Sequence, residues 1–171
     1  MNSIEAGAFS WVRIQRLYDP DPVVHWQRCE VAVSAGGFTQ LFHDEANNED
    51  FAVVVRSVDW GKVKWEMEEM SGIALRHMRV DREFQLAVDE ARDHAVCYGI
   101  VDEREEVVNH WRDAGSWLVP PVVVSADFLG GGSRYELLVG YTRLGNLLGM
   151  LDREEVKEAQ KHLVWVGRGV P

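Results

Sequence analysis

The stretch from residue 120 to residue 145 constrains the fold most, because strong strand and helix signals follow one another there over a short length. The β-branched run Val122–Ser125 and the apolar run at 134–139 flank three consecutive glycines at 130–132. Two such runs joined by a glycine-rich turn predict a β-hairpin. Leucines at 144, 147, 148 and 151 then recur with helical spacing, which predicts a helix at about 142–151 directly after the second strand.

The junction between this strand and this helix predicts an anion-binding corner. The first N–H groups of a helix have no intrahelical partner and lie at the positive end of the helix dipole. A guanidinium beside them can bind phosphate oxygens in a bidentate manner. The candidate ligand-binding residues are Gly140, Tyr141, Thr142, Arg143, Leu144 and Gly145. We expect them to hold phosphate or a similar anion, with Arg143 as the clamp.

A purely structural interpretation of the same corner stays open. Gly140 then serves only to adopt a positive φ, and Thr142 only caps the helix. Arg143 pairs with one of the many carboxylates, and Tyr141 fills the pocket instead of stacking on a base. A clear general base or magnesium carboxylate is missing from the corner; Glu136, on the preceding strand, alternates with Tyr135 and Leu137, and its side chain can face either way.

The pattern Tyr-x-Leu-x-x-Gly-x-x-Arg-Leu, from Tyr135 to Leu144, resembles the Gly-x-x-Arg motif of the ParB/sulfiredoxin-like superfamily. The resemblance covers about residues 103 to 170. It implies an α+β fold, with a ParB/sulfiredoxin-like mixed sheet and flanking helices as a core domain at 102–171. Residues 1–101 then form an N-terminal α/β elaboration of strands and helices that packs on this core.

The same resemblance implies a nucleotide-phosphate pocket at the helix start, with ATP or CTP and magnesium as ligands. Phosphotransfer or nucleotide hydrolysis is the activity that it implies. Tyr141 and Thr142 stand where sulfiredoxins carry a Cys and a His, so thiol chemistry is not expected. No residue of the chain is assigned a catalytic role.

The net charge of −10 bears on the choice of partner. Affinity for duplex DNA comes from Lys and Arg side chains that neutralise phosphates, so the charge argues against duplex DNA. It favours a basic protein partner, because long-range attraction speeds encounter. The alternative function is therefore a non-enzymatic acidic binding protein with a degenerate pocket, such as an immunity protein, an antitoxin or a phage or defence accessory factor. For that function we expect an interface of Trp65 surrounded by Glu66, Glu68 and Glu69.

The cysteines, the histidines and the lengths of the apolar runs bear on metal binding and on membrane association. Cys29 and Cys97 are far apart in sequence and form no Cys/His cluster at metal spacing, so we expect two buried reduced thiols and no metal site. The six scattered histidines are expected at the surface or in the core. No apolar run approaches the ~20 residues of a membrane helix, and the first residues lack a signal-peptide pattern. We therefore expect a cytoplasmic protein without membrane contact.

Periodicity along the rest of the chain predicts further elements. We expect strands at about 29–33, 38–42, 51–55 and 163–166, and helices at about 62–70, 81–95, 103–114 and 152–161. The helix at 62–70 is inferred from the spacing of Val63, Met67 and Met70. Asp81 and Asp102 are the expected N-caps of the next two helices. Gly115 is expected to end the helix that precedes it.

Overall fold

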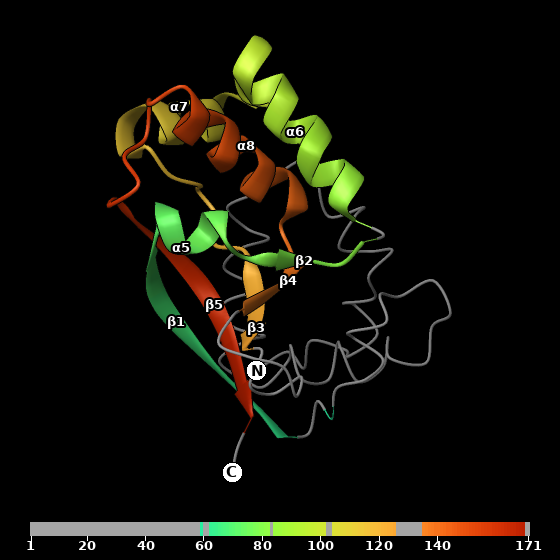
Figure 1. Ribbon diagram of the computed structural model, residues 1–171. Coiled ribbons are helices and arrows are strands. Elements are labelled where there is room, and N and C mark those ends of the chain that lie inside the picture. Colours follow the sequence, from blue (N-terminus) through green and yellow to red (C-terminus); the bar gives the residue numbers. More distant parts are fainter. Residues whose placement is uncertain (1–58, 60–61, 83, 102–103, 126–134, 170–171) are drawn as a thin grey trace, which may run out of the picture. The chain divides into compact units, whose positions relative to one another are not determined.

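The computed structural model describes residues 59, 62–82, 84–101, 104–125 and 135–169. These residues form a mixed five-stranded β-sheet and four helices, so the fold belongs to the α+β class (Figure 1). The strands predicted at 29–33, 38–42 and 51–55 lie outside the described residues, as do the glycines at 130–132. Residues 66–167 form one compact unit, and residues 1–65 with 168–171 form another. The predicted domain boundary between residues 101 and 102 falls within the first of these units.

The sheet has the strand order β1-β5-β3-β4-β2. Strand β3 (Val122–Ser125) pairs antiparallel with β4 (Tyr135–Val139), which confirms the predicted hairpin. On its other side β3 pairs in parallel with β5 (Lys161–Gly169), the predicted closing strand. Strand β2 (Arg79–Val80) pairs in parallel with β4. The valines of β3 are buried, as expected for a central strand whose sequence is continuously apolar.

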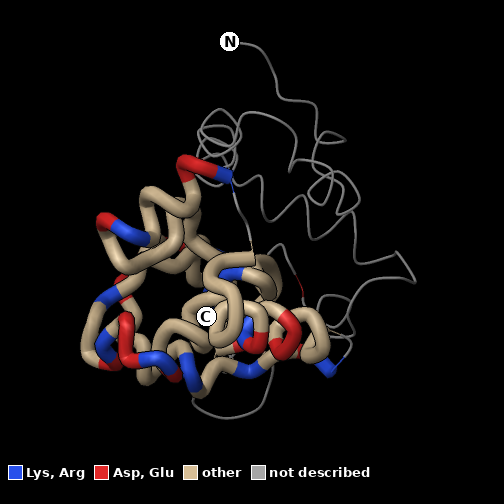
Figure 2. The backbone as a smooth tube through the Cα atoms, turned by 90° about the horizontal axis from the view of Figure 1, so that it is seen from above, with Lys and Arg blue, Asp and Glu red and all other residues tan. Residues whose placement is uncertain are grey.

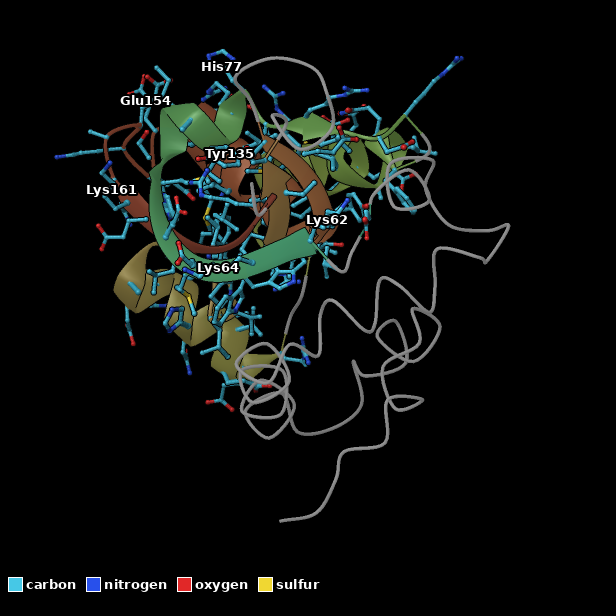
Figure 3. All side chains as sticks on the ribbon, turned by 90° about the horizontal axis from the view of Figure 1, so that it is seen from below. Lys62, Lys64, His77, Tyr135, Glu154 and Lys161 are labelled. Atoms are coloured by element: carbon cyan, nitrogen blue, oxygen red, sulfur yellow. The ribbon has the colours of Figure 1, made fainter. Side chains whose placement is uncertain are left out.

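Strand β1 (Val63–Ser71) replaces the helix predicted at 62–70, so that prediction is wrong. Apolar and charged residues alternate from Val63 to Glu68, and this strand-like period competes with the helical spacing of Val63, Met67 and Met70. Placement beside β5 decides between the two, because strand formation depends on the available partner more than on intrinsic preference. In Figure 3 the labels of Lys62 and Lys64 mark the beginning of β1. Trp65 is partly buried in this strand.

Helix α8 (Tyr141–Asp152) confirms the predicted helix after the hairpin. The other helices are α5 (Gly72–Arg76), α6 (Gln85–Cys97) and α7 (Glu105–Ala114). The N-caps of α6 and α7 are Phe84 and Arg104, so the predicted caps Asp81 and Asp102 are wrong. Gly115 ends α7 with a φ of 61°, as predicted. The helix predicted at 152–161 is wrong, because turns connect the end of α8 to β5.

Helices α6 and α8 pack side by side with unusually close backbones (Figure 1). A Cβ added to Gly145 would lie 2.5 Å from the Val88 carbonyl oxygen and 2.6 Å from the Ala91 Cβ. A Cβ added to Gly149 would lie 2.5 Å from the Ala95 Cβ. Small residues on both helices therefore set the distance between them, since no side chain separates the two backbones.

An ion-pair cluster ties the end of α8 to α5 and α6. The Asp152 carboxylate accepts hydrogen bonds from Nη1 of Arg76 at 2.8 Å and from Nε of Arg92 at 2.6 Å. Partial burial by itself would raise the pKa of this carboxyl, but the bonds from Arg92 and Arg76 outweigh burial and lower the pKa. The cluster thus fixes the C-terminal end of α8 through charge as well as through packing.

Candidate functional site

The turn between β4 and α8 contains Gly140, and side chains of the protein surround this residue. This glycine is the N-cap of α8 and has a φ of 107°, a conformation that other residues rarely adopt. A Cβ at this position would lie 2.8 Å from the Pro121 Cβ and 3.1 Å from Nη2 of Arg143. The space over the glycine is therefore occupied by the protein's own side chains.

Arg143 donates hydrogen bonds to two main-chain carbonyls. Its Nη1 donates to the Val119 oxygen at 2.9 Å and to the Pro120 oxygen at 3.2 Å. Both carbonyls belong to the segment that leads into β3, so the guanidinium joins the first turn of α8 to the entry of the central strand. Arg143 thus clamps the backbone at this turn.

Tyr141 packs between α6 and the sheet. Its ring stacks on that of Phe84, with a centroid distance of 4.4 Å and an interplanar angle of 15°. Its hydroxyl lies 3.5 Å from the carbonyl oxygen of Leu137, a long contact for a hydrogen bond. This placement matches the interpretation in which Tyr141 fills the corner.

The remaining residues of the predicted site separate along α8. Thr142 is the second residue of the helix, so its prediction as N-cap is wrong; the cap position belongs to Gly140. The Leu144 amide already donates to the Gly140 carbonyl at 2.9 Å, and its side chain is buried. Gly145 lies against α6. The structure thus gathers Gly140, Tyr141, Thr142 and Arg143 at the turn and directs the other two residues into the core.

Glu136, whose orientation the sequence left open, is buried in β4 and only 2 % exposed. Its Oε2 lies 3.1 Å from Nε of Arg79, the residue that it faces on the neighbouring parallel strand β2. Burial raises the pKa of this carboxyl, and nearby Asp81 adds to the effect, while Arg79 opposes it. Arg79 is mostly exposed, so the pair connects a buried carboxylate to the surface at the edge of the sheet.

A contact between half-buried Ser116 and buried His162 was not foreseen from the sequence. Ser116 Oγ and His162 Nδ1 are 2.9 Å apart, and His162 is 1 % exposed. Its Nε2 is buried and has no hydrogen-bond partner among the described residues. Burial lowers the pKa of His162 to about 4, so the ring is neutral at pH 7. The alternating burial of β5 places it on the inner face with Val164 and Val166, a period-two signal that the sequence does carry.

An exposed face of α6 combines negative charge with apolar side chains. We call the residues Leu86, Asp89, Glu90 and Asp93, with Tyr98 directly after the helix, the outer face of α6. Leu86 is 67 % exposed and Tyr98 84 %. The three carboxylates are exposed, and none forms an ion pair with a described residue. Arg92 of the same helix points to Asp152 instead.

Elsewhere in the described chain acidic and basic residues are interspersed, as Figure 2 shows. Residues 62–82, 84–101, 104–125 and 135–169 contain no group of three or more His, Cys, Asp and Glu that could hold a metal ion. Within the same ranges, no helix has the length and apolar character that a membrane span requires. Cys97 is exposed, so the prediction of a buried thiol is wrong for this residue, whereas Cys29 lies outside the described residues.

A comparison with protein-family models finds no match, and comparisons with curated proteins and with solved structures find none either.

Proposed function

We propose that this protein is a non-enzymatic acidic binding protein that docks a basic partner on the outer face of α6. In this proposal the Gly-x-x-Arg corner is a structural clamp on a ParB/sulfiredoxin-like scaffold. Folds of this kind host unrelated functions, so the scaffold does not itself imply catalysis.

The observation that carries the proposal is the composition of the outer face of α6. Three carboxylates without an ion-pair partner among the described residues lie between two exposed apolar side chains, Leu86 and Tyr98. An aromatic or aliphatic anchor surrounded by charge is a common interface pattern. A partner segment fits this face when its Lys or Arg side chains pair with the three carboxylates and its apolar side chains contact Leu86 and Tyr98.

The geometry of the corner supports the same proposal. Arg143 is engaged with two main-chain carbonyls, and Pro121 and Arg143 fill the space over Gly140. The partner surface accordingly differs from the one expected from sequence. Glu66, Glu68 and Glu69 lie on strand β1 with a partly buried Trp65, and not on an amphipathic helix.

The alternative function is anion binding at the start of α8, with a nucleotide phosphate and magnesium as the implied ligands. Its support is the partly exposed turn of Tyr141, Thr142 and Arg143 at a helix N-terminus. A thermal-denaturation series with ATP, CTP or GTP and magnesium separates the two functions. An upward shift that disappears in Arg143→Lys supports anion binding, since lysine keeps the charge but loses the fork.

The partner proposal is tested with two matched triple variants. Asp89→Asn/Glu90→Gln/Asp93→Asn removes three exposed carboxylates from α6, and Glu105→Gln/Glu106→Gln/Asp113→Asn removes three exposed carboxylates from α7. Both variants lose the same charge. We expect proteins captured from the source cell by the native chain to be captured by the α7 variant and lost by the α6 variant.

Association kinetics with the purified partner complete this test. The on-rate is expected to fall as salt rises, because screening acts over ~8 Å at physiological ionic strength. Equal capture by all three chains, or an on-rate indifferent to salt, argues against the outer face of α6 as the docking surface.

A further inference from the structure

A cavity of about 490 Å³ lies inside the unit formed by residues 66–167, at the opposite end of α8 from the Gly140 corner. It is bounded by the end of α6, by α7 and by the turn after α8. Its principal lining residues are Tyr98, Trp111, Arg112, Met150, Arg153 and Val156. In Figure 3 the label of Glu154 marks the turn that carries Arg153. The volume falls in the range of roughly 300–1,000 Å³ typical of small-molecule sites.

Three apolar side chains of the core reach the inner wall of the cavity. Trp111, Met150 and Val156 all belong to the buried core and still contribute surface to the cavity. Tyr98, 84 % exposed, stands at the rim and offers a ring that is not packed into the core. A flat apolar group would therefore bury its surface against Trp111 and Met150 and meet a second aromatic ring where it faces solvent.

The charges that line the cavity sum to a positive value, although the chain as a whole is acidic. Among the described residues, the charged ones that line the cavity are Arg112, Arg153 and Glu155. Nη2 of Arg153 pairs with the Glu155 carboxylate at 2.5 Å. Arg112 donates to the amide oxygen of Asn109 at 2.8 Å and forms no ion pair with a described residue. One positive charge at the cavity is thus left without a carboxylate.

Arg153 also carries an unsatisfied donor. Its Nε is buried and has no hydrogen-bond partner among the described residues. This atom is closed to solvent, so a carboxylate in the cavity would bond the outer guanidinium nitrogens of Arg153, where charge-assisted hydrogen bonds are strong. The charge of Arg112 and the guanidinium of Arg153 therefore favour the same kind of ligand group, a carboxylate.

We propose that this cavity binds a small organic acid with one carboxylate and a flat aromatic body. The carboxylate lies against the guanidinium groups of Arg112 and Arg153, and the ring lies on Trp111, Met150 and Val156. Tyr98 covers the ring from the solvent side. This site is separate from the outer face of α6 apart from Tyr98, and it requires no activity at the Gly140 corner.

The test is a ligand-observed NMR screen of the full chain with paired probes. Each aromatic carboxylate, such as benzoate, phenylacetate or indole-3-acetate, is paired with its neutral primary amide. We expect at least one acid to bind saturably and its amide to bind at least tenfold more weakly. Equal binding of acids and amides, or no saturable binding by any acid, overturns the proposal.

Variants connect the binding to this cavity. Arg153→Gln and Arg112→Gln are each expected to weaken the best acid at least tenfold, and Tyr98→Ala, at an exposed position, to weaken acid and amide alike. Arg82→Gln removes the same charge from an exposed turn and is expected to bind as the native chain does. Circular dichroism checks that each variant is folded. If Arg153→Gln, Arg112→Gln and Tyr98→Ala, all folded, retain native affinity, the acid binds elsewhere and the proposal is wrong.

Discussion

The two ends of helix α8 use an arginine in opposite ways. At the N-terminal end, Arg143 donates to the carbonyls of Val119 and Pro120 and closes the turn over Gly140. At the C-terminal end, Arg153 lines a cavity and keeps a buried Nε without a hydrogen-bond partner among the described residues. The same residue type thus bonds the main chain at one end of the helix and pairs with a carboxylate at the edge of a cavity at the other.

The difference between the two ends shows that a sequence motif does not by itself mark a binding site. The Gly-x-x-Arg motif lies at the N-terminal end, where Nη1 of Arg143 donates to two main-chain carbonyls. At the C-terminal end the chain has no motif, yet its aromatic and polar groups converge. Trp111, at the cavity wall, contacts Trp117 edge to face at 6.2 Å, and Trp117 lies 5.3 Å from the His162 ring. A second partly unsatisfied polar group, His162, therefore stands behind the cavity.

Titration of His162, behind the cavity, is expected to change the stability of the protein more than any of the substitutions below. Its pKa is about 4 in the folded protein, against an ordinary value of 6.5. Between these two values the unfolded chain binds more protons than the folded one, so the stability is fully present above pH 6.5 and falls as the pH drops towards 4. The loss is expected to reach about 3 kcal/mol, which chemical denaturation across this pH range measures.

The matched control is His162→Asn, whose side chain can still reach Ser116 but does not titrate. We expect its stability to lack the loss that His162 causes between pH 6.5 and 4 in the native chain. The raised pKa of Glu136 acts with the opposite sign above pH 4.5, because there the folded state binds more protons, and it acts equally in both chains. Parallel pH profiles for the native chain and for His162→Asn would show that His162 is not protonated on unfolding.

The second prediction tests the comparison of the two arginines directly. Arg143→Met removes two hydrogen bonds from a charged donor and is expected to lower the free energy of unfolding by about 2 kcal/mol. Arg153→Met removes only a partly exposed ion pair with Glu155, for which we expect about 0.5 kcal/mol or less. Urea denaturation of both variants measures the difference. Equal losses would mean that the two ends of α8 do not differ in the way described.

Sequence reasoning reached the hairpin, α8 and β5 because their signals are local. A glycine-rich turn between apolar runs and a leucine stripe do not depend on distant partners. It failed at β1, where the helical and the strand-like periods occur in the same residues. The neighbouring strand β5 decides between them, and it lies almost a hundred positions later in the chain. It failed likewise for the cavity, because Tyr98, Trp111 and Arg153 are brought together only by the packing of three elements.

The smallest effect concerns the middle of α8, which holds its two ends in place. Gly149→Ala adds a methyl group 2.5 Å from the Ala95 Cβ and 2.7 Å from the Arg92 carbonyl oxygen. Overpacking of this kind costs ~1–3 kcal/mol, but alanine recovers ~1 kcal/mol of helix propensity, so we expect a net loss of about 1 kcal/mol.

A double-mutant cycle isolates the contact between the helices. Ala95→Gly alone loses helix propensity, yet in the Gly149→Ala background it removes the nearest clashing atom. We therefore expect the double variant to be more stable than the sum of the two single losses predicts, by more than the ~0.3–0.5 kcal/mol within which independent sites add. Strict additivity would mean that α6 and α8 shift apart freely. In that case the closed corner and the open cavity at the two ends of α8 would not be held in a fixed relation by this packing.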